Sequence, residues 1–529
     1  MDINNRIATI RNSRLFRTES ILLVFMLTYA LLISSRPAFN APVSLDPALR
    51  HYILLGEFND LIHNVVYLEL APPGWHIISY SLIRLSPVGE ILTLNVFNII
   101  LISATIVSAY LCISRIYTRD IGLLAAFLVP ANYTLLDYAT RADHYIPFAA
   151  TAIFVTTTAV YASSSTDIEG GTNRQLAVYS LLILISGFTH YYSMILVAAV
   201  GLGGLQIRWS NSRALARWIL AHVPLFLGYL LWLPNLYFQY QLYSQRFGTG
   251  GGDLLVFGPA ESITPINAFQ FFPNNVIVFL GIIFLTILTV GVVLIGSTAA
   301  INPQTRILII AVFGTVFGIL LVDIGLGNGG GRYALQAVTL VPLGIVVGVK
   351  RLYSLNNRMK REWKNILISV IVLVSLFYGG GVIQYGISGG DMSTNGEEYV
   401  KAANDIDDYV DAAPEQTVVL STLHAGEGIL KYYNSGSYEV NGVPKDAFDQ
   451  NRMSIPIHTD QIYEESNSDH HQRLNRLVAD KDYVIVFLAH ANTRNRYDPV
   501  RDALVSRGFT PVENSGSEGA GYVMFERTQ

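Results

Sequence analysis

The chain has 529 residues, of which 51% are hydrophobic and only 14% charged, and its formal net charge is −4. This composition, with a mean hydropathy of +0.39, excludes an ordinary soluble enzyme, in which about a quarter of the residues are charged. Apolar stretches of the roughly 20 residues needed to cross a bilayer recur along most of the sequence, so we expect a polytopic α-helical membrane protein.

About eleven apolar stretches are long enough to be transmembrane helices. The first lacks a small-residue cleavage site and is followed by many others, so we expect it to remain as a helix and not to be removed as a signal peptide. The single cysteine, Cys112, lies in the second stretch and excludes an intramolecular disulfide. The stretches cover residues 20–36, 88–114, 120–136, 145–162, 174–188, 191–207, 215–234, 274–297, 305–323, 334–350 and 365–384.

Basic residues gather in alternate loops between these stretches, and short basic loops face the cytoplasm. Four arginines between Arg6 and Arg17 place the N-terminus inside, and the dense basic cluster between Lys350 and Lys364 falls on the same side. We therefore expect a multi-pass plasma-membrane protein with a cytoplasmic N-terminus. The segments expected outside are residues 37–87, 137–144, the turn at His190, residues 235–273, 324–333 and everything after 385.

The chain divides into a membrane domain, residues 1–384, and a tail, residues 390–529. The tail alternates helical and strand patterns, which predicts a soluble, extracytoplasmic α/β domain. It has no phosphate-binding loop, nucleotide fingerprint or zinc-ligand spacing. Helices are predicted over residues 397–410, 426–433, 461–477 and 499–507, and strands over residues 417–421, 482–488 and 521–526.

The long external loop 235–273 contains the glycine-rich run 248–252. Glycine permits a loop to change its backbone conformation at little cost. The loop is therefore either a mobile flap over a site or a plain flexible connector, and the sequence favours neither.

The predicted external loops carry acidic, basic and histidine side chains close to the membrane boundary. A carboxylate at that depth is costly and usually functional, and Asp46 after the first stretch is the first example. A carboxylate near arginines suits a reaction in which a hydroxyl loses its proton while a phosphate departs, because arginines hold the phosphate. The candidate residues are Asp46, Glu57, Arg141, Asp143, His190, Tyr191, Arg332 and Tyr333.

Short motifs that contain these side chains follow one another along the chain. They read Leu45-Asp46-Pro47, Ala71-Pro72-Pro73-Gly74-Trp75, Tyr138-Ala139-Thr140-Arg141-Ala142-Asp143-His144-Tyr145, Thr189-His190-Tyr191-Tyr192, Leu233-Pro234 with Gln239, and Gly331-Arg332-Tyr333. Their order and external placement resemble the GT-C membrane glycosyltransferases of the protein mannosyltransferase and aminoarabinose transferase type. The resemblance covers residues 20–385. The Trp-Trp-Asp signature of oligosaccharyltransferases is absent, which argues against transfer of a whole glycan.

The resemblance implies a hexosyl- or pentosyltransferase that takes a monosaccharide from a polyprenyl-phosphate donor by inverting displacement. The acceptor would be a glycan, a lipid or a protein at the outer face of the bilayer, and no nucleic acid is expected as a partner. The resemblance assigns the general base to Asp46, donor-phosphate binding to Arg332 and Arg141, and substrate contacts to Glu57, Asp143, His190, Tyr191 and Tyr333.

The first motif departs from the pattern of its relatives, many of which have Asp-Glu where this chain has Asp46-Pro47. Glu57 and Asp60 are the candidates to replace the missing acid. No cofactor is expected. A divalent metal ion is compatible with the carboxylates, but the spacing of the histidines matches no compact metal-ligand motif.

Each of these residues also has a structural interpretation. Asp46 precedes a proline and fits a turn or a helix cap, Arg141 and Asp143 fit an ion pair, and Arg332 fits an arginine that reaches the lipid headgroups. For the whole chain, the alternatives are a transporter or flippase of a lipid-linked sugar and a non-catalytic membrane scaffold. A transporter is expected to carry ionisable residues in broken helices, whereas these stretches are nearly free of charge.

Overall fold

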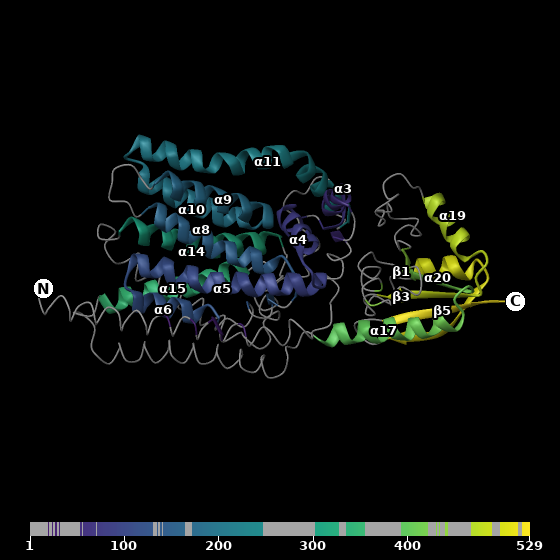
Figure 1. Ribbon diagram of the computed structural model, residues 1–529. Coiled ribbons are helices and arrows are strands. Elements are labelled where there is room, and N and C mark those ends of the chain that lie inside the picture. Colours follow the sequence, from purple (N-terminus) through teal and green to yellow (C-terminus); the bar gives the residue numbers. More distant parts are fainter. Residues whose placement is uncertain are drawn as a thin grey trace, which may run out of the picture.

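The structure, a computed structural model, comprises a helix bundle and a smaller part built around a β-sheet (Figure 1). All structural statements below concern the described residues. These are residues 53–54, 57–69, 71–130, 141–163, 172–246, 302–326, 335–354, 393–421, 440–442, 467–488, 498–516 and 521–528, with isolated positions Ser20, Val24, Leu27, Thr28, Leu31, Leu135, Tyr138, Ala139, Leu430 and Tyr433.

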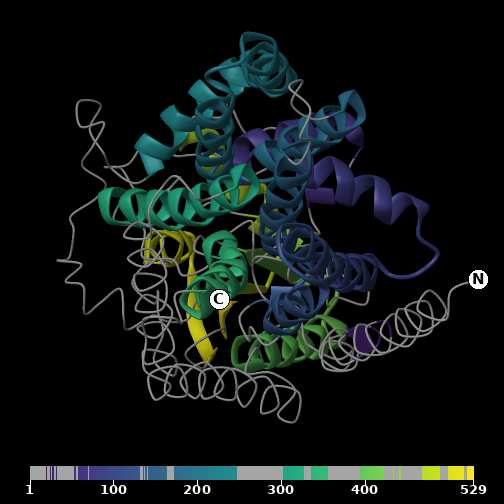
Figure 2. The same ribbon diagram turned by 90° about the vertical axis from the view of Figure 1, so that its left-hand side faces the viewer.

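Long helices run side by side in the bundle (Figure 1), and Figure 2 shows the same bundle from its end. They coincide with the predicted apolar stretches to within a few residues, except at the ends of two helices, α6 and α11. The helices are α5 (Glu90–Ile116), α6 (Arg119–Leu128), α8 (Tyr145–Ala162), α9 (Asn173–Thr189), α10 (Ser193–Arg208), α11 (Ser212–Arg246), α14 (Pro303–Leu326) and α15 (Leu335–Ser354).

Helix α11 is 35 residues long, and its C-terminal part corrects one expectation. Residues 235–246 were expected to begin the external loop, but they continue the helix. The physical reason is local, because no glycine or proline occurs between Pro234 and Gly248 to end it. The rest of the expected loop, residues 247–273, lies outside the described residues. Helix α6 also differs from its prediction: it ends at Leu128, whereas the predicted apolar stretch ends at residue 136.

Three described helical segments are long and apolar enough to cross a membrane: Glu90–Ile116, Tyr145–Ala162 and Ser212–Tyr240. Shorter apolar segments are Ser193–Arg208, Pro303–Ile319 and Leu335–Gly348. The predicted spans 274–297 and 365–384, and most of 20–36, lie outside the described residues. The number of spans therefore stays a prediction.

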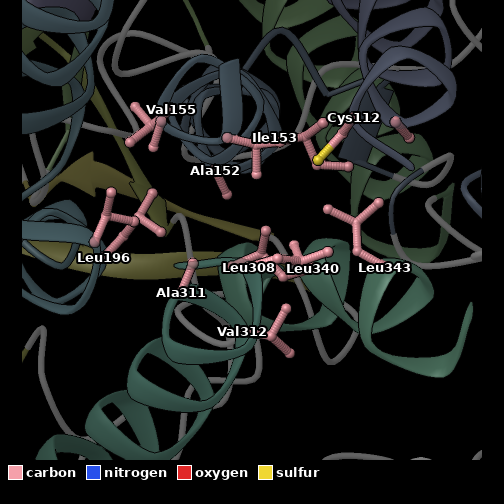
Figure 3. Close-up of a cluster of buried hydrophobic side chains, with 14 of the residues drawn as sticks. Cys112, Ala152, Ile153, Val155, Leu196, Leu308, Ala311, Val312, Leu340 and Leu343 are labelled. Atoms are coloured by element: carbon pink, nitrogen blue, oxygen red, sulfur yellow. The ribbon is translucent and has the colours of Figure 1, made fainter. Parts of the chain in front are cut away.

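Helix α8 is the centre of the bundle, with 15 of its 18 residues buried. It packs against α5, α9, α14 and α15. Alanines along α8 allow these neighbours to approach closely, as small residues do in membrane helix packing. Figure 3 shows part of this core, where Ala152 and Ile153 of α8 face Leu308 and Leu340 of α14 and α15. The free Cys112 is buried in the same cluster.

The second part contains a five-stranded sheet in the order β2-β1-β3-β5-β4. Strands β2, β1 and β3 are parallel, and β5 pairs antiparallel with both β3 and β4. Both faces of the central strands are buried, one under α17 and the other under α19 and α20. The elements are α17 (Ser393–Ala412), β1 (Thr417–Ser421), β2 (Val440–Gly442), α19 (Asn467–Val478), β3 (Tyr483–Leu488), α20 (Asp498–Val505), β4 (Phe509–Gly516) and β5 (Gly521–Arg527).

The predicted tail strands at 417–421, 482–488 and 521–526 correspond to β1, β3 and β5. Strand β4 was not predicted, because Pro511 and a polar sequence are untypical of a central strand. The structure explains this difference, since β4 is an edge strand with an irregular register between Pro511 and Glu513. Most of the predicted helix 426–433 and the beginning of 461–477 lie outside the described residues.

Candidate active site

The described part of residues 37–87, the first loop predicted to be external, forms short helices at the end of the bundle nearest the sheet (Figure 1). Helix α3 (Phe58–Asn64) runs into a π-helical turn, η1 (Val65–Glu69), and α4 (Gly74–Leu85) follows. π-Turns are rare, and they frequently occur at functional sites. The turn ends at Glu69, an acid within the otherwise apolar sequence 65–70.

Gly74 lets the first loop lie against the end of α9. A Cβ atom at this position would lie 2.5 Å from the carbonyl oxygen of Phe188, so any larger residue would push the two segments apart. The segment Pro72-Pro73-Gly74, noted in the sequence as a motif, therefore packs directly beside the turn that carries His190.

A second turn, residues 141–144, is held by two asparagines of α5. Asn95 Oδ1 accepts a hydrogen bond of 2.7 Å from the backbone N–H of Ala142, and Asn98 Nδ2 donates one of 3.4 Å to the carbonyl oxygen of Asp143. Ala142 has a φ of +49°, a left-handed conformation that is unfavourable for alanine. Such strain persists only where surrounding contacts fix the backbone, and it is often found at functional sites.

These two turns bring an acidic cluster together, which we define as Glu69, Asp143 and His144. His144 Nδ1 lies 3.0 Å from Asp143 Oδ1 and 4.0 Å from Glu69 Oε1. All three side chains are at most 7% exposed. Buried carboxylates must be compensated by a proton, a cation or hydrogen bonds, so this cluster is a place where a charge or a proton is bound.

His190 stacks on the acidic cluster. Its ring lies 5.2 Å from that of His144 at an interplanar angle of 20°, and 4.5 Å from the ring of Phe148. The backbone N–H of Tyr192 donates a hydrogen bond of 3.2 Å to His190 Nδ1. This nitrogen therefore acts as an acceptor, which leaves Nε2 as the protonated nitrogen of the neutral ring.

The other predicted site residues have varied surroundings. The guanidinium of Arg141 lies 4.5 Å from the centre of the Tyr138 ring, a cation–π contact. Tyr191 donates a hydrogen bond to Gln239 of α11 and accepts one of 3.0 Å from Trp232 Nε1. Glu57 is exposed and forms a capping box with Asp60 at the start of α3. The substrate roles of these residues stay predictions.

The structure brings together two of the predicted site residues, Asp143 and His190, with two that were not selected, Glu69 and His144. Asp46, Arg332 and Tyr333 lie outside the described residues. A sequence signal for Glu69 did exist, because a lone acid in an apolar run beside a Pro-Pro motif is costly unless it has a partner. In the described part of the chain, no group of three or more His, Cys, Asp or Glu side chains is arranged to hold a metal ion.

Comparison by sequence finds no relative. No model of a known protein family matches the chain, and no curated protein matches it.

Comparison by structure does find similar folds. The chain is similar to ArnT from Cupriavidus metallidurans bound to undecaprenyl phosphate, with a TM-score of 0.56 and 11% identity over 95% of this chain and 97% of that chain. It is also similar to the oligosaccharyltransferase of Archaeoglobus fulgidus in complex with Zn and sulfate, with a TM-score of 0.54 and 12% identity over 95% and 72%. AglB of the same organism, with an inhibitory peptide and a dolichol-phosphate, gives a TM-score of 0.53, 12% identity and coverages of 95% and 74%. These neighbours have the GT-C fold, and this chain shares it.

Proposed function

We propose that this chain, which has the GT-C fold, is a membrane glycosyltransferase that transfers a monosaccharide from a polyprenyl-phosphate donor to an acceptor hydroxyl. The observation that carries the proposal is the acidic cluster, buried at the junction of the first-loop turn with helices α8 and α9. A polyprenyl-phosphate donor agrees with the undecaprenyl phosphate and dolichol-phosphate bound to two of the structural neighbours.

The proposed reaction is a single displacement. The acceptor hydroxyl gives its proton to a carboxylate, for which we retain Asp46, while its oxygen attacks the anomeric carbon of the donor sugar. The bond from that carbon to the phosphate oxygen breaks, the configuration inverts, and the polyprenyl phosphate leaves with the electron pair. Arg332 and Arg141 would bind the leaving phosphate, because guanidinium groups match phosphate geometry.

Glu69 would supply the second acid that the first motif lacks at Pro47. The two candidates named from sequence, Glu57 and Asp60, cap a helix at the surface, whereas Glu69 is buried and reaches His144. In this proposal Glu69 and Asp143 accept hydrogen bonds from sugar hydroxyl groups, and His144 holds the two carboxylates near one another. No cofactor takes part.

The proposal is tested with purified protein in lipid vesicles and a panel of radiolabelled polyprenyl-phosphate sugars. Wild type should transfer label to an acceptor, and Asp46→Asn should lower kcat by about 10²- to 10⁴-fold, the usual contribution of a general base. Glu69→Gln and Asp143→Asn should each also lower transfer. Asp120→Asn, at an exposed position in the first turn of α6, is the matched control and should transfer normally.

Three outcomes would contradict parts of this proposal. Equal transfer by wild type and Asp46→Asn would exclude Asp46 as the base. Loss of transfer after EDTA treatment, restored by a divalent metal, would overturn the expectation that no cofactor takes part. Movement of lipid-linked sugar across the vesicle membrane, without transfer from any donor, would identify a transporter instead.

A further inference from the structure

Gln239 connects helix α11 to the first loop across 168 residues of sequence. Its side-chain Nε2 donates hydrogen bonds to the carbonyl oxygens of Val65, at 3.3 Å, and Ala71, at 3.2 Å. The residue is only 3% exposed. A buried amide is costly unless its hydrogen bonds are made, so a polar residue here needs a reason.

The two acceptor carbonyls lie on either side of Glu69. Val65 begins the π-turn and Ala71 follows its end, so one amide group joins both ends of the segment that carries the carboxylate. A π-turn is less favourable than an ordinary α-turn and keeps its shape only where its surroundings fix it. The two hydrogen bonds that Gln239 donates constrain the turn in this way.

A chain of hydrogen bonds fixes the orientation of the amide. Trp232 Nε1 can only donate, so Tyr191 Oη accepts from it and directs its own hydrogen to Gln239 Oε1, at 2.5 Å. A tyrosine hydroxyl keeps its proton at neutral pH and can therefore donate it to Gln239. With Oε1 accepting, Nε2 must face the two carbonyls.

We propose that Gln239 is a positioning residue for the reaction, which holds the π-turn Val65–Glu69 so that the Glu69 carboxylate meets His144. Tyr191 and Trp232 orient the amide and are part of the same device. The inference rests on the proposed glycosyl transfer, and it gives the predicted substrate residue Tyr191 a different task. The proposal is supported by the hydrogen bonds that run from Trp232 through Tyr191 to Gln239, and from Gln239 to the carbonyl groups at both ends of the turn.

The first test measures the shape of the turn without any substrate. Glu69→Cys places a thiol on the turn, and the native Cys112 is buried in the bundle core and should react slowly. The rate of modification by a small charged thiol reagent is then compared with Gln239 intact and with Gln239→Glu, which keeps the volume and can still accept from Tyr191. Glutamate cannot donate to two carbonyls, so the thiol should react about tenfold faster or more, as local opening becomes easier.

A matched control separates loosening of the turn from general unfolding. Ser79→Cys lies on the neighbouring helix α4 and is fully buried. Its thiol should react at the same slow rate in both Gln239 backgrounds. Unchanged reactivity at position 69, or equal acceleration at positions 69 and 79, would overturn the proposal.

The second test uses the transferase assay on the chain with native Glu69. Gln239→Glu and Tyr191→Phe should lower kcat by about 10- to 100-fold with little change in KM, because a sugar held by a displaced Glu69 is still bound but poorly aligned for the displacement. The same variants should keep the thermal unfolding temperature within a few degrees of wild type. If wild type transfers no sugar, the proposed function fails, while the thiol measurement still decides whether Gln239 holds the turn.

Discussion

At the scale of single residues, the candidate site depends on a few polar side chains that hold unusual backbone. Ala142 has a left-handed conformation that costs about 1 to 2 kcal/mol in an L-residue other than glycine. Asn95 stabilises it through a short bond to the Ala142 N–H. The neighbouring Asn98 makes only a long bond of 3.4 Å, and within the described residues its Oδ1 has no hydrogen-bond partner. The two asparagines, one helical turn apart, should therefore contribute unequally.

We expect Asn95→Ala to destabilise the protein by about 1 to 2 kcal/mol more than Asn98→Ala, because only the first leaves a buried backbone N–H without its acceptor. Thermal unfolding of the two variants in the same detergent measures the difference. Both substitutions remove the same volume from the same helix, so each controls for the other. A larger loss of stability in Asn98→Ala would show that Asn95 does not hold the turn.

At the scale of elements, glycines decide how closely the helices of the bundle approach. Trp218 of α11 lies against Gly204 of α10, where a Cβ atom would come within 2.1 Å of its ring. The Trp218 Nε1 donates to the carbonyl oxygen of Gly201, and the guanidinium of Arg208 lies 4.2 Å from the ring centre. Arg208 also donates to the carbonyl oxygen of Ala162 at the end of α8. The Trp218 indole thus fixes how closely α10 and α11 cross. Arg208, which lies on the face of the indole, connects these two helices to α8.

Gly204→Ala should destabilise the protein by about 1 to 3 kcal/mol or more, since a methyl group there must displace the indole or part the helices. Gly89→Ala is the control, because nothing lies within 4 Å of the Cβ position at residue 89. This substitution should change the stability of the protein by about 0.5 kcal/mol or less. Thermal unfolding and tryptophan fluorescence report both effects. Equal stability of the two variants would contradict the close α10–α11 packing.

At the scale of the whole molecule, one face of α5 contacts both the tail and the candidate site. Ile91, in the first turn of α5, packs against the α17 core of the tail and also against the cluster that contains Trp75 and Ala142. Asn95 and Asn98 follow at intervals of four and three residues, so they lie on the same side of the helix. The tail therefore rests on the helix that holds the 141–144 turn.

We expect Ile91→Asp to loosen the tail, because a carboxylate would replace an aliphatic side chain between two apolar clusters. Limited proteolysis of the full chain should release the tail about tenfold faster or more, as local opening is favoured. Val88→Asp, at a position that is 49% exposed just before α5, should be cleaved like wild type. Equal cleavage of both variants would mean that Ile91 does not anchor the tail.

Much of the secondary structure could be predicted because it depends on local patterns. The apolar stretch 145–162 and helix α8 have the same ends, and the strand pattern 417–421 is strand β1. The errors have equally local causes. Helix α11 continues through Pro234, which a helix tolerates when its neighbours compensate, and edge strand β4 contains a proline. The boundaries of such elements depend on neighbours that the local pattern does not include.

The candidate site was predicted only in part. Asp143 and His190 were selected as polar residues of predicted external loops that fit the family motifs, and the structure places both beside His144. Glu57 was selected and Glu69 was not, because an exposed loop acid and a buried one look alike in a sequence. The substrate role of either residue stays a prediction. The two acids differ in how deeply their side chains are buried and in which side chains they contact.

The sequence by itself determined which segments are apolar helices, where polar side chains interrupt them, and that the chain resembles membrane glycosyltransferases. These properties depend on residues near one another in the chain, where the cost of polar groups in an apolar medium acts directly. Only the tertiary structure decided that Glu69 meets His144 and that Gln239 holds the turn between Val65 and Ala71. Those contacts join segments far apart in sequence, and packing of whole helices, not local preference, brings them together.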